Sequence, residues 1–404
     1  MITVEEARNF ILKLARDYGI ESVILEDSYG RIAARQINSP IDLPVFDNSS
    51  VDGYAVQTAD IINTSTDNPV ELKVVATVPA GEFFNGEIGP GECVQVFTGS
   101  RIPRGADAVV MVEATQKSDT KTDTVKILAS VRPWENIRMR GEDILYGTPI
   151  IKAGEKITIG KLGVLSSVGI DKIPVWKRPT IAIISSGSEL RKPGEKLNPG
   201  EIYECNLILL SRLIEKVCAA PVLKEFVSDT ENDVEKTLSR AFDSTDVVIT
   251  TGGISVGKYD LIKNVFEKIG GKIHFWKIIM KPGRPFVFGQ IKNKFWFGLP
   301  GNPLSAVVTY TVLVRPFLMK SQKAAVIDLP TESGELAEDI TNPGNRRHFM
   351  RVKIDDRKRV SLSGKQTSHG LSSILEANGL IDVPPRTTLK KGDLVSVIKW
   401  EVSG

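Results

Sequence analysis

The spacing of hydrophobic and polar positions changes several times along this 404-residue chain, and each change predicts a different kind of element. Within residues 3–18, Ile11 and Leu14 belong to one apolar face at helical spacing. Thr3 is followed three residues later by Glu6, which is the capping-box pattern of a helix start. We therefore expect the chain to begin with an amphipathic helix.

Between residues 47 and 137 the pattern shortens to β-prone runs separated by Gly, Pro, Asp and Asn. Such short, turn-bounded runs predict a small β-rich module. The expected strands are 71–78, 93–98, 108–112 and 122–127. Residues 141–170 are rich in Gly and Ile and include a short expected helix at 159–167.

From about residue 177 the pattern alternates between apolar strands and amphipathic helices, which predicts a doubly wound, parallel α/β domain. Strands are expected at 181–184, 222–227, 247–249 and 295–299. Helices are expected at 201–219, 232–242, 259–269 and from Pro303 onward, with Asn302 as the N-cap of the last one. After residue 328, short strands at 349–354, 359–363, 379–383 and 394–400 predict a small C-terminal β barrel.

Charge and composition narrow the classes of partner. The 52 basic and 49 acidic residues leave a formal charge of only +3, so nothing requires nucleic acid or a membrane surface. No window approaches the apolar length of a membrane span. Cys93, Cys205 and Cys218 lie far apart without a CxxC pair, which excludes a disulfide framework. With a charged N-terminus that lacks an apolar signal core, these features predict a cytoplasmic protein.

The α/β region carries small and polar residues where its strands end. The carboxyl ends of parallel strands meet at one edge of a sheet, so these loops should converge on a ligand. The loop 250–260 is the most informative, because glycines allow backbone N–H groups to approach a phosphate and Asp260 follows as a Mg²⁺ ligand. The alternative is that each loop is an ordinary strand-to-helix turn. The expected ligand-binding residues of these loops are Ser186, Gly187, Thr251, Gly252, Gly253, Ser255, Gly257, Pro300, Gly301, Asn302, Pro303 and Ser305.

A stiff basic turn lies between the loop at 250–260 and the loop that contains Pro300 to Ser305. Lys277, Lys281, Pro282 and Arg284 combine three cations with a proline, which suits a clamp for phosphate or another oxyanion. The alternative is a solvated cluster of surface charge.

Three segments of the first half also carry dense polar chemistry. Residues 44–55 contain Asp47, Ser49 and Asp52 with no helical or strand period, which is more than a turn requires. Thr98 ends a predicted strand, although a plain strand end with a tight turn would also explain it. The third segment, which could also be a charged hairpin, places Arg138 and Arg140 before Asp143.

Several catalytic arrangements are not supported. His274, His348 and His369 lack ligand spacing, so a zinc site is not expected. The sequence contains neither a GxSxG nucleophile elbow nor a Walker A lysine motif. Covalent catalysis is therefore not expected.

Seven motifs occur in order along almost the whole chain and resemble the molybdopterin molybdenumtransferases of the MoeA type, a family that includes the gephyrin E domain. The motifs are PVFDNSSVDGYA, VFTGSRIPRGADAVV, RMRGEDI, IAIISSGSEL, DVVITTGGISVGKYD, KPGRPFVFG and LPGNPLSA. The resemblance implies four domains: a discontinuous linker and dimerisation domain (1–46 and 138–176), a β-rich inserted domain (47–137), a molybdopterin-binding α/β domain (177–327) and a C-terminal β-barrel domain (328–404).

The resemblance also implies an activity. A homodimer with its site between the subunits would take adenylylated molybdopterin and molybdate or tungstate. It would cleave the phosphoanhydride with Mg²⁺, insert the metal and release AMP. This would be the last step of molybdenum cofactor biosynthesis, and the adenylyltransferase of the same pathway is a possible partner. Two alternatives stay open: a molybdopterin adenylyltransferase, and a scaffold without enzymatic activity as in the gephyrin E domain.

Residue roles follow from the resemblance position by position. The catalytic acids would be Asp52, Asp143, Glu189, Asp229 and Asp260, of which Glu189, Asp229 and Asp260 would hold the metal. Substrate-binding residues would include Thr98, Arg138, Arg140, Lys277, Lys281, Pro300, Pro303, Arg351 and Ser368. Ser188 and Arg284 stand where the family more usually has Asp and Lys. Since carboxylates alone would repel a tetrahedral dianion, we expect two adjoining subsites, one basic and one metal-loaded.

Overall fold

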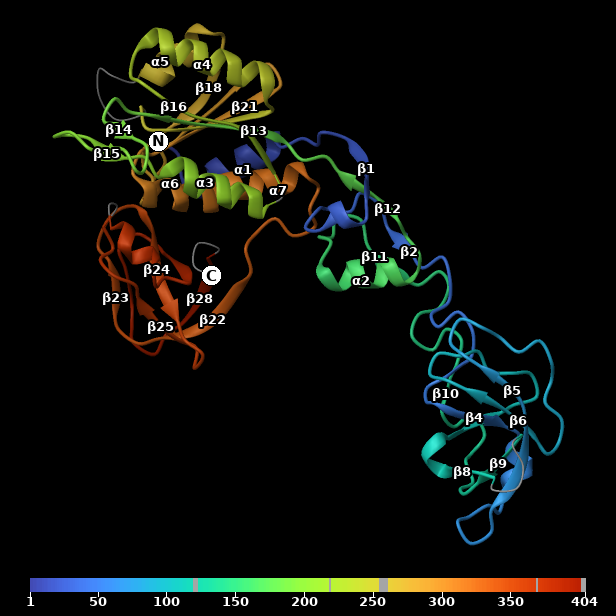
Figure 1. Ribbon diagram of the computed structural model, residues 1–404. Coiled ribbons are helices and arrows are strands. Elements are labelled where there is room, and N and C mark those ends of the chain that lie inside the picture. Colours follow the sequence, from blue (N-terminus) through green and yellow to red (C-terminus); the bar gives the residue numbers. More distant parts are fainter. Residues whose placement is uncertain (119–122, 218, 254–260, 368–369, 401–404) are drawn as a thin grey trace.

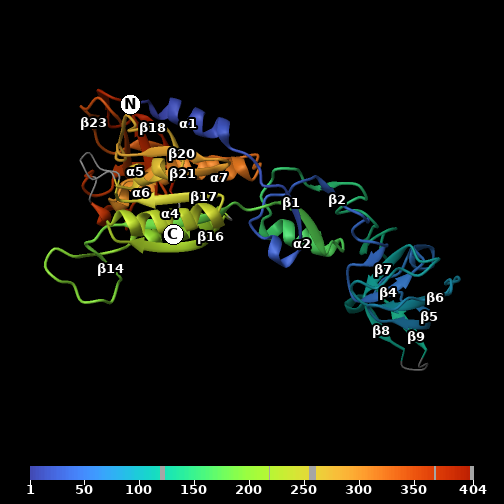
Figure 2. The same ribbon diagram turned by 90° about the horizontal axis from the view of Figure 1, so that it is seen from above.

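The computed structural model describes residues 1–118, 123–217, 219–253, 261–367 and 370–400. It shows an extended molecule (Figure 1), in which an α/β layer and a C-terminal barrel lie at one end. A small linker unit occupies the middle, and a β module lies at the far end in both views (Figures 1 and 2). No helix among the described residues is long and apolar enough to cross a membrane.

The expected first helix is present as α1 (Val4–Leu14) and ends earlier than predicted. The capping box is formed, because Thr3 N donates to Glu6 and Glu6 N donates to the Thr3 hydroxyl. The apolar face of α1 buries Val4, Ala7 and Ile11 in the core of the α/β layer. The helix therefore belongs physically to that layer, although the linker unit follows it in sequence.

The linker unit is built from two antiparallel strand pairs and one helix. Its elements are β1 (Ile20–Ile24) paired with β12 (Lys172–Trp176), β2 (Ile37–Asn38) paired with β11 (Pro149–Ile151), and α2 (Ile159–Ser167). A third pair, β3 (Asn48–Ser49) with β10 (Ile137–Arg138), joins it to the β module. The chain thus enters and leaves the β module side by side.

The β module contains one six-stranded sheet, as the short apolar runs predicted. Its strand order is β7-β4-β6-β5-β9-β8. The strands are β4 (Gly53–Val56), β5 (Val70–Val78), β6 (Glu92–Val96), β7 (Ala108–Met111), β8 (Thr115–Lys117) and β9 (Thr124–Ile127).

The α/β layer has a six-stranded sheet in the order β16-β13-β17-β21-β20-β18, whose first four strands are parallel. The strands are β13 (Thr180–Ser186), β16 (Ala220–Val227), β17 (Val247–Thr251), β18 (Lys272–Trp276), β20 (Val287–Ile291) and β21 (Lys294–Leu299). Helices α1, α3 (Asn206–Lys216), α6 (Pro303–Thr309) and α7 (Arg315–Ser321) contribute to the core on one face. Helices α4 (Glu231–Ser244) and α5 (Leu261–Lys268) cover the other.

Three features differ from the sequence prediction. The sheet is not purely parallel, because a two-residue turn at Lys292, with φ +51°, folds β20 back onto β21 as a hairpin. Helix α3 begins later than expected, since β15 (Ile202–Tyr203) first pairs with β14 (Leu190–Arg191). The last helix is interrupted by a π turn at Tyr310–Val314, where Pro316 cannot supply the N–H that an α-helix would use.

The C-terminal module is a small barrel, as expected. The barrel strands are β22 (Thr331–Leu336), β24 (Arg347–Ile354), β25 (Arg359–Leu362), β26 (Gly379–Val383) and β28 (Leu394–Lys399). A separate antiparallel pair is formed by β23 (Ile340–Asn342) and β27 (Thr387–Leu389). Pairing of β24 with β26 closes the barrel. A short strand from the α/β layer, β19 (Met280–Lys281), pairs in parallel with β24 and places the basic turn against the barrel.

Candidate active site

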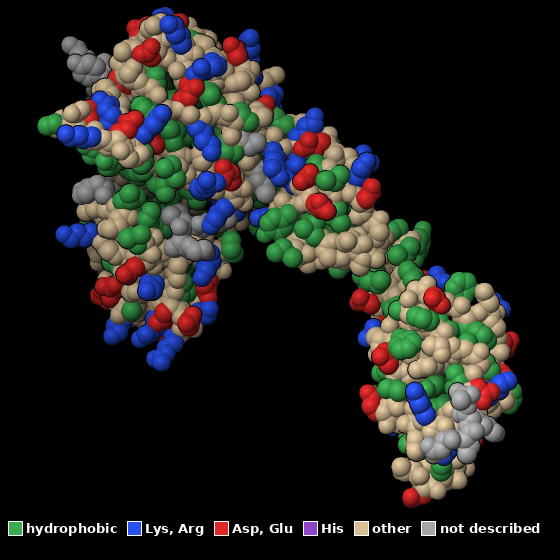
Figure 3. All heavy atoms as spheres, viewed as in Figure 1, with side chains coloured by type: hydrophobic (Ala, Val, Ile, Leu, Met, Phe, Trp, Pro, Cys, Tyr) green, Lys and Arg blue, Asp and Glu red, His purple; other side chains and the backbone are tan. Residues whose placement is uncertain are grey.

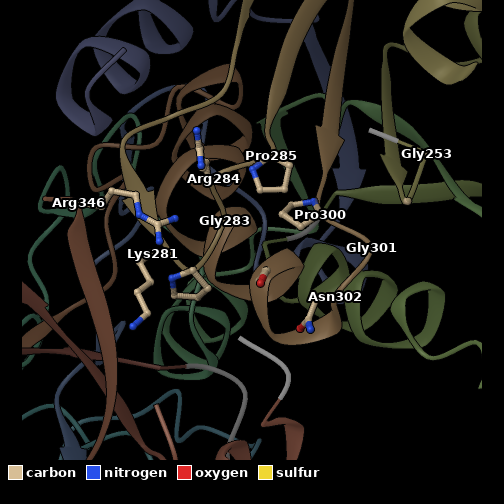
Figure 4. Close-up of a pocket in the computed structure, with 12 residues that line it drawn as sticks. Gly253, Lys281, Gly283, Arg284, Pro285, Pro300, Gly301, Asn302 and Arg346 are labelled. Carbon is tan, nitrogen blue, oxygen red and sulfur yellow. The ribbon is translucent and has the colours of Figure 1, made fainter. Parts of the chain in front are cut away.

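A pocket of about 460 Å³ lies where the loops after β17 and β21 meet the basic turn (Figure 4). This is the carboxyl edge of the parallel strands, where open α/β sheets bind their ligands. The pocket brings together many residues that the sequence predicted for binding. It is lined by Gly252, Gly253, Lys281, Pro282, Gly283, Arg284, Pro285, Pro300, Gly301, Asn302, Ser305 and Arg346.

Glycines are required where the strand-end loops pack against one another. Gly252 has φ +81°, and a Cβ atom there would lie 2.2 Å from the carbonyl oxygen of Ser186. A Cβ on Gly301 would lie 3.2 Å from the Cα atom of Gly252. The loops after β13, β17 and β21 are therefore stacked backbone on backbone, which leaves their N–H groups close to any bound anion.

The end of β13 meets the end of β16 through a carboxylate. The Ser186 hydroxyl donates to Asp229, and the Ser188 backbone N–H donates to the other carboxylate oxygen at 3.3 Å. Asp229 and Glu189 are both exposed. Carboxylate oxygens are ligands that Mg²⁺ takes in proteins, so the two side chains are chemically compatible with the expected ion.

The remaining metal predictions are untested. Asp260, the third expected metal ligand, lies outside the described residues, as do the expected substrate-binding residues Ser255 and Gly257. Within the described ranges, no group of three or more His, Cys, Asp or Glu side chains is arranged to hold a metal. The magnesium site therefore stays a prediction.

Three cations line the pocket, and the described residues include no acidic partner for them. Figure 4 shows Lys281 and Arg346 on one side of the pocket and Gly301 and Asn302 on another, with Arg284 nearby. No ion pair in the described part of the chain involves Lys281, Arg284 or Arg346. Because no described acidic side chain neutralises their charge, the positive pocket favours an anionic ligand.

A second cavity of about 400 Å³ shares Lys281 and Arg346 with the first and extends along the barrel. His348 lines it, is 4% exposed, and has no hydrogen-bond partner for Nε2 among the described residues. Burial, followed by the charges of Lys281, Arg351 and Arg346, lowers the pKa of His348 to about 4. At neutral pH this imidazole is therefore uncharged.

Two predicted substrate-binding cations of the second half of the chain, Lys277 and Arg351, do not line either cavity. The Lys277 ammonium lies 3.6 Å from the centre of the Trp276 ring, and its backbone has φ +67°. Arg351 is completely buried in the barrel, where Nε donates to Ser373 at 2.9 Å and the guanidinium also donates to the carbonyl oxygen of Lys365. Burial lowers the pKa of Arg351 to about 10. Arg351 thus braces the segment that leads to Ser368, which itself lies outside the described residues.

The predicted site residues of the first half form their own cluster near the linker end of the β module. Asp52 accepts hydrogen bonds from the N–H and the hydroxyl of Thr98, both at 2.8 Å, and these bonds lower the pKa of Asp52. Asp47 accepts the N–H of Arg140 at 2.7 Å. The paired strands β3 and β10, which carry Ser49 and Arg138, and the loop that carries Asp143 adjoin this cluster.

Within one chain, this distal cluster is not brought to the pocket. The β module and the α/β layer lie at opposite ends of the molecule (Figures 1 and 2). Two groups of predicted residues are therefore well formed but separate.

Sequence reasoning missed Arg346, which lines both cavities. Its only signal was the run of cations before a predicted strand, at Arg346 and Arg347. The pairing of β19 with β24, which brings Arg346 beside Lys281, joins segments too distant for a single sequence to connect.

Family models match most of the chain. Residues 2–169 match the MoeA N-terminal region (domain I and II), residues 182–320 match a probable molybdopterin binding domain, and residues 333–400 match the MoeA C-terminal region (domain IV).

Individual relatives agree over the full length. The chain is 35% identical over 390 residues to molybdopterin molybdenumtransferase 2 of Mycobacterium tuberculosis, covering 95% of this chain and 96% of the relative. It is 34% identical over 404 residues to the molybdopterin molybdenumtransferase of Haemophilus influenzae, covering 98% of each. Among solved structures, the molybdopterin biosynthesis MoeA protein of Pyrococcus horikoshii superposes with a TM-score of 0.81 at 32% identity, covering 99% of both chains.

Proposed function

Since this chain belongs to the MoeA family of molybdopterin molybdenumtransferases, we propose that it performs the last step of molybdenum cofactor biosynthesis on an adenylylated pterin. The substrate would be adenylylated molybdopterin with molybdate or tungstate. The enzyme would cleave the phosphoanhydride, pass the metal to the dithiolene sulfurs and release AMP.

The observation that carries this proposal is the pair of adjoining cavities that share Lys281 and Arg346. The first is walled by glycine loops, which suit a phosphate group. The second adds the neutral His348 and further polar groups of the barrel, which suit a tetrahedral oxyanion. Two anions held side by side match a reaction between a phosphoanhydride and a metal oxyanion.

The residues of the pocket would stabilise the negative charge of the phosphate groups during the reaction. Lys281, Arg284 and Arg346 would bind the phosphate oxygens as negative charge develops on them. Asp229 and Glu189, with Asp260, would hold Mg²⁺, which supplies further neutralisation of the anhydride. No protein nucleophile is needed, because holding the two anions in place contributes most of the rate enhancement.

We also propose that the working enzyme is a homodimer whose partner completes the site. The distal cluster around Asp52 and Thr98 is well ordered but remote from the pocket of its own chain. The linker unit exposes apolar side chains, among them Ile24, Tyr29 and Ile159, at 48%, 56% and 73% exposure. Figure 3 shows hydrophobic side chains gathered on this unit, as expected for a surface that a second copy covers.

The test is AMP release from adenylylated molybdopterin with Mg²⁺ and molybdate, measured by chromatography. Lys281→Ala should lower the rate about 100-fold or more, because an electrostatic contact to the reacting anion is lost. Lys272→Ala is the matched control, since Lys272 is exposed on β18 and lines neither cavity. An inactive wild-type enzyme, or equal rates for the two variants, would refute the proposal.

The same assay addresses two further questions: which oxyanion is used, and whether the enzyme is an adenylyltransferase instead. Competition between molybdate and tungstate identifies the preferred oxyanion. Incubation with ATP and molybdopterin should give no adenylylated product, whereas formation of that product would point to an adenylyltransferase instead.

A further inference from the structure

Asn206 begins helix α3 directly beneath the pocket and is 6% exposed. Its side-chain nitrogen donates to the carbonyl oxygen of Gly301 at 2.8 Å and lies 3.4 Å from the Thr251 hydroxyl. Thr251 in turn donates to the Ser185 hydroxyl at 3.1 Å. One side chain therefore connects the ends of β17 and β21, and through Thr251 it also reaches β13.

The chemistry of the partners fixes the orientation of this amide. A backbone carbonyl can only accept a hydrogen bond, so the nitrogen of Asn206 must face Gly301. The carboxamide oxygen is then buried, and it has no hydrogen-bond partner among the described residues. A buried amide that leaves one group unpaired is costly, which indicates a role beyond stabilising the helix start.

The loops joined by Asn206 are those that form the glycine wall of the pocket. Gly252, Gly253 and Gly301 line it, and a Cβ atom on Gly301 would lie 3.2 Å from the Cα atom of Gly252. Asn206 itself does not line the pocket. Its effect on a ligand would be transmitted through the backbone of these glycines.

We propose that Asn206 is a positioning residue for the reaction, which sets the distance between the two glycine loops that hold the anionic group. This inference rests on the proposed function for its kinetic consequence, but not for its structural one. A wider spacing would leave ligand contacts available and misalign the reacting group, so kcat should fall more than KM rises. A displacement of the reacting group by about 1 Å lowers the rate about tenfold to 100-fold.

The sharpest test is Asn206→Asp, which keeps the shape of the side chain. An ionised carboxylate cannot donate to Gly301, whereas a protonated carboxyl can. Burial raises the pKa of a carboxyl group, so protonation should occur in an accessible range. AMP release by this variant should therefore be partly restored as pH falls, relative to wild type at the same pH.

Other titratable groups near α3 must be taken into account. Glu204, whose carboxylate accepts the Leu207 N–H at 2.9 Å, and Cys205 precede the helix, and Asp229 lies beside Ser186. All three are retained in wild type and variant, so the ratio of the two rates isolates the new carboxyl group. Asn206→Ala should be slow at every pH, with no restoration in acid.

A second measurement does not depend on catalysis. Hydrogen exchange of the amides at 251–253 and 301–302, without ligand, should be faster in Asn206→Ala than in wild type. Ser211→Ala is the control, because Ser211 is also buried on α3 and, among the described residues, its hydroxyl bonds only to the carbonyl oxygen of Leu207 in its own helix.

The outcomes distinguish the two ideas. If wild type releases no AMP while exchange still rises only in the Asn206 variant, the proposed function fails and the positioning role stands. If Asn206→Ala matches wild type in kcat and in exchange, or if Asn206→Asp shows no recovery in acid, the inference is overturned. Circular dichroism melting of all variants identifies any that fail to fold.

Discussion

At the scale of single residues, Gly252 is the most constrained position of the pocket. Its φ of +81° disfavours any L side chain, and an added Cβ would overlap the Ser186 carbonyl oxygen. Gly252→Ala should lower the free energy of unfolding by about 1–3 kcal/mol and weaken anion binding. Urea denaturation and molybdate titration would measure both.

Gly160→Ala is the matched control for this change. Gly160 lies in helix α2 with no atom within 4 Å of an added Cβ and without a positive φ. Its replacement should be neutral or slightly stabilising, since Ala is the better helix former. Equal destabilisation by both substitutions would contradict the account of Gly252.

His348 provides a pH-dependent prediction at the same scale. Its folded pKa of about 4 lies below the ordinary value of 6.5, so the unfolded chain takes up a proton in that range and the folded chain does not. The free energy of unfolding should therefore decrease as pH falls from 6.5 toward 4. In an NMR titration, the His348 ring resonance, assigned by its loss in His348→Gln, should stay unshifted down to about pH 5. A midpoint near the ordinary value would contradict the burial argument.

Residue type alone predicted much of the pocket but could not predict burial. Gly252, Gly301 and Lys281 were expected at the site and line the pocket. Arg351 was assigned to substrate by resemblance, yet the structure places it inside the barrel, because nothing in its sequence neighbourhood reveals the hydroxyl and carbonyl groups that surround it.

At the scale of elements, helix α1 depends on its N-terminal cap. Thr3→Ala removes the hydroxyl that accepts the Glu6 N–H and should cost about 1 kcal/mol of stability. Asn9→Ala is the control, because Asn9 is exposed on the same helix. Unfolding in urea should rank the control at or above wild type and Thr3→Ala below it, while similar values for both variants would argue against the cap.

Elements that depend on local interactions were predicted well, whereas those that depend on contacts between distant segments were not. Local signals, such as the capping box at Thr3 and the Asn302-Pro303 start of α6, located helix starts correctly. Pairing between distant segments was not predicted. The pairing of β19 with β24 joins residues that lie far apart in the sequence, so it depends on a tertiary contact that leaves no periodic trace.

At the scale of the whole molecule, a site shared between subunits predicts complementation. Asp52→Asn alters the distal cluster and Lys281→Ala alters the pocket, so each homodimer should release AMP slowly. In a mixed dimer, one site would combine the intact pocket of the first variant with the intact distal cluster of the second. An equal mixture, unfolded and refolded together, should recover about a quarter of wild-type activity. Activity no higher than the mean of the two variants would show that each site is built from one chain.

The order of the modules was predictable from changes in pattern, but their arrangement was not. Residues 47–137 read as a separate β module, and the structure shows a separate sheet there. Its distance from the pocket depends on the direction in which the linker unit projects, which is set by the pairing of β1 with β12 and of β2 with β11. The family resemblance implied a cleft between subunits, and in the single chain the segment with Asp47 and Asp52 does lie away from the pocket.

The pairing of β3 with β10 has a consequence for how such a molecule can be altered. Ser49 lies opposite Ile137 and Asn48 lies opposite Arg138, so the two crossings into the β module are adjacent. Because its two ends are adjacent, the β module could be removed or replaced as a unit. A tight turn joining Ser49 to Ile137 would close the linker unit after removal of the β module. Another module with neighbouring termini could be inserted in its place. Recombination can thus exchange the distal module while the pocket is inherited unchanged.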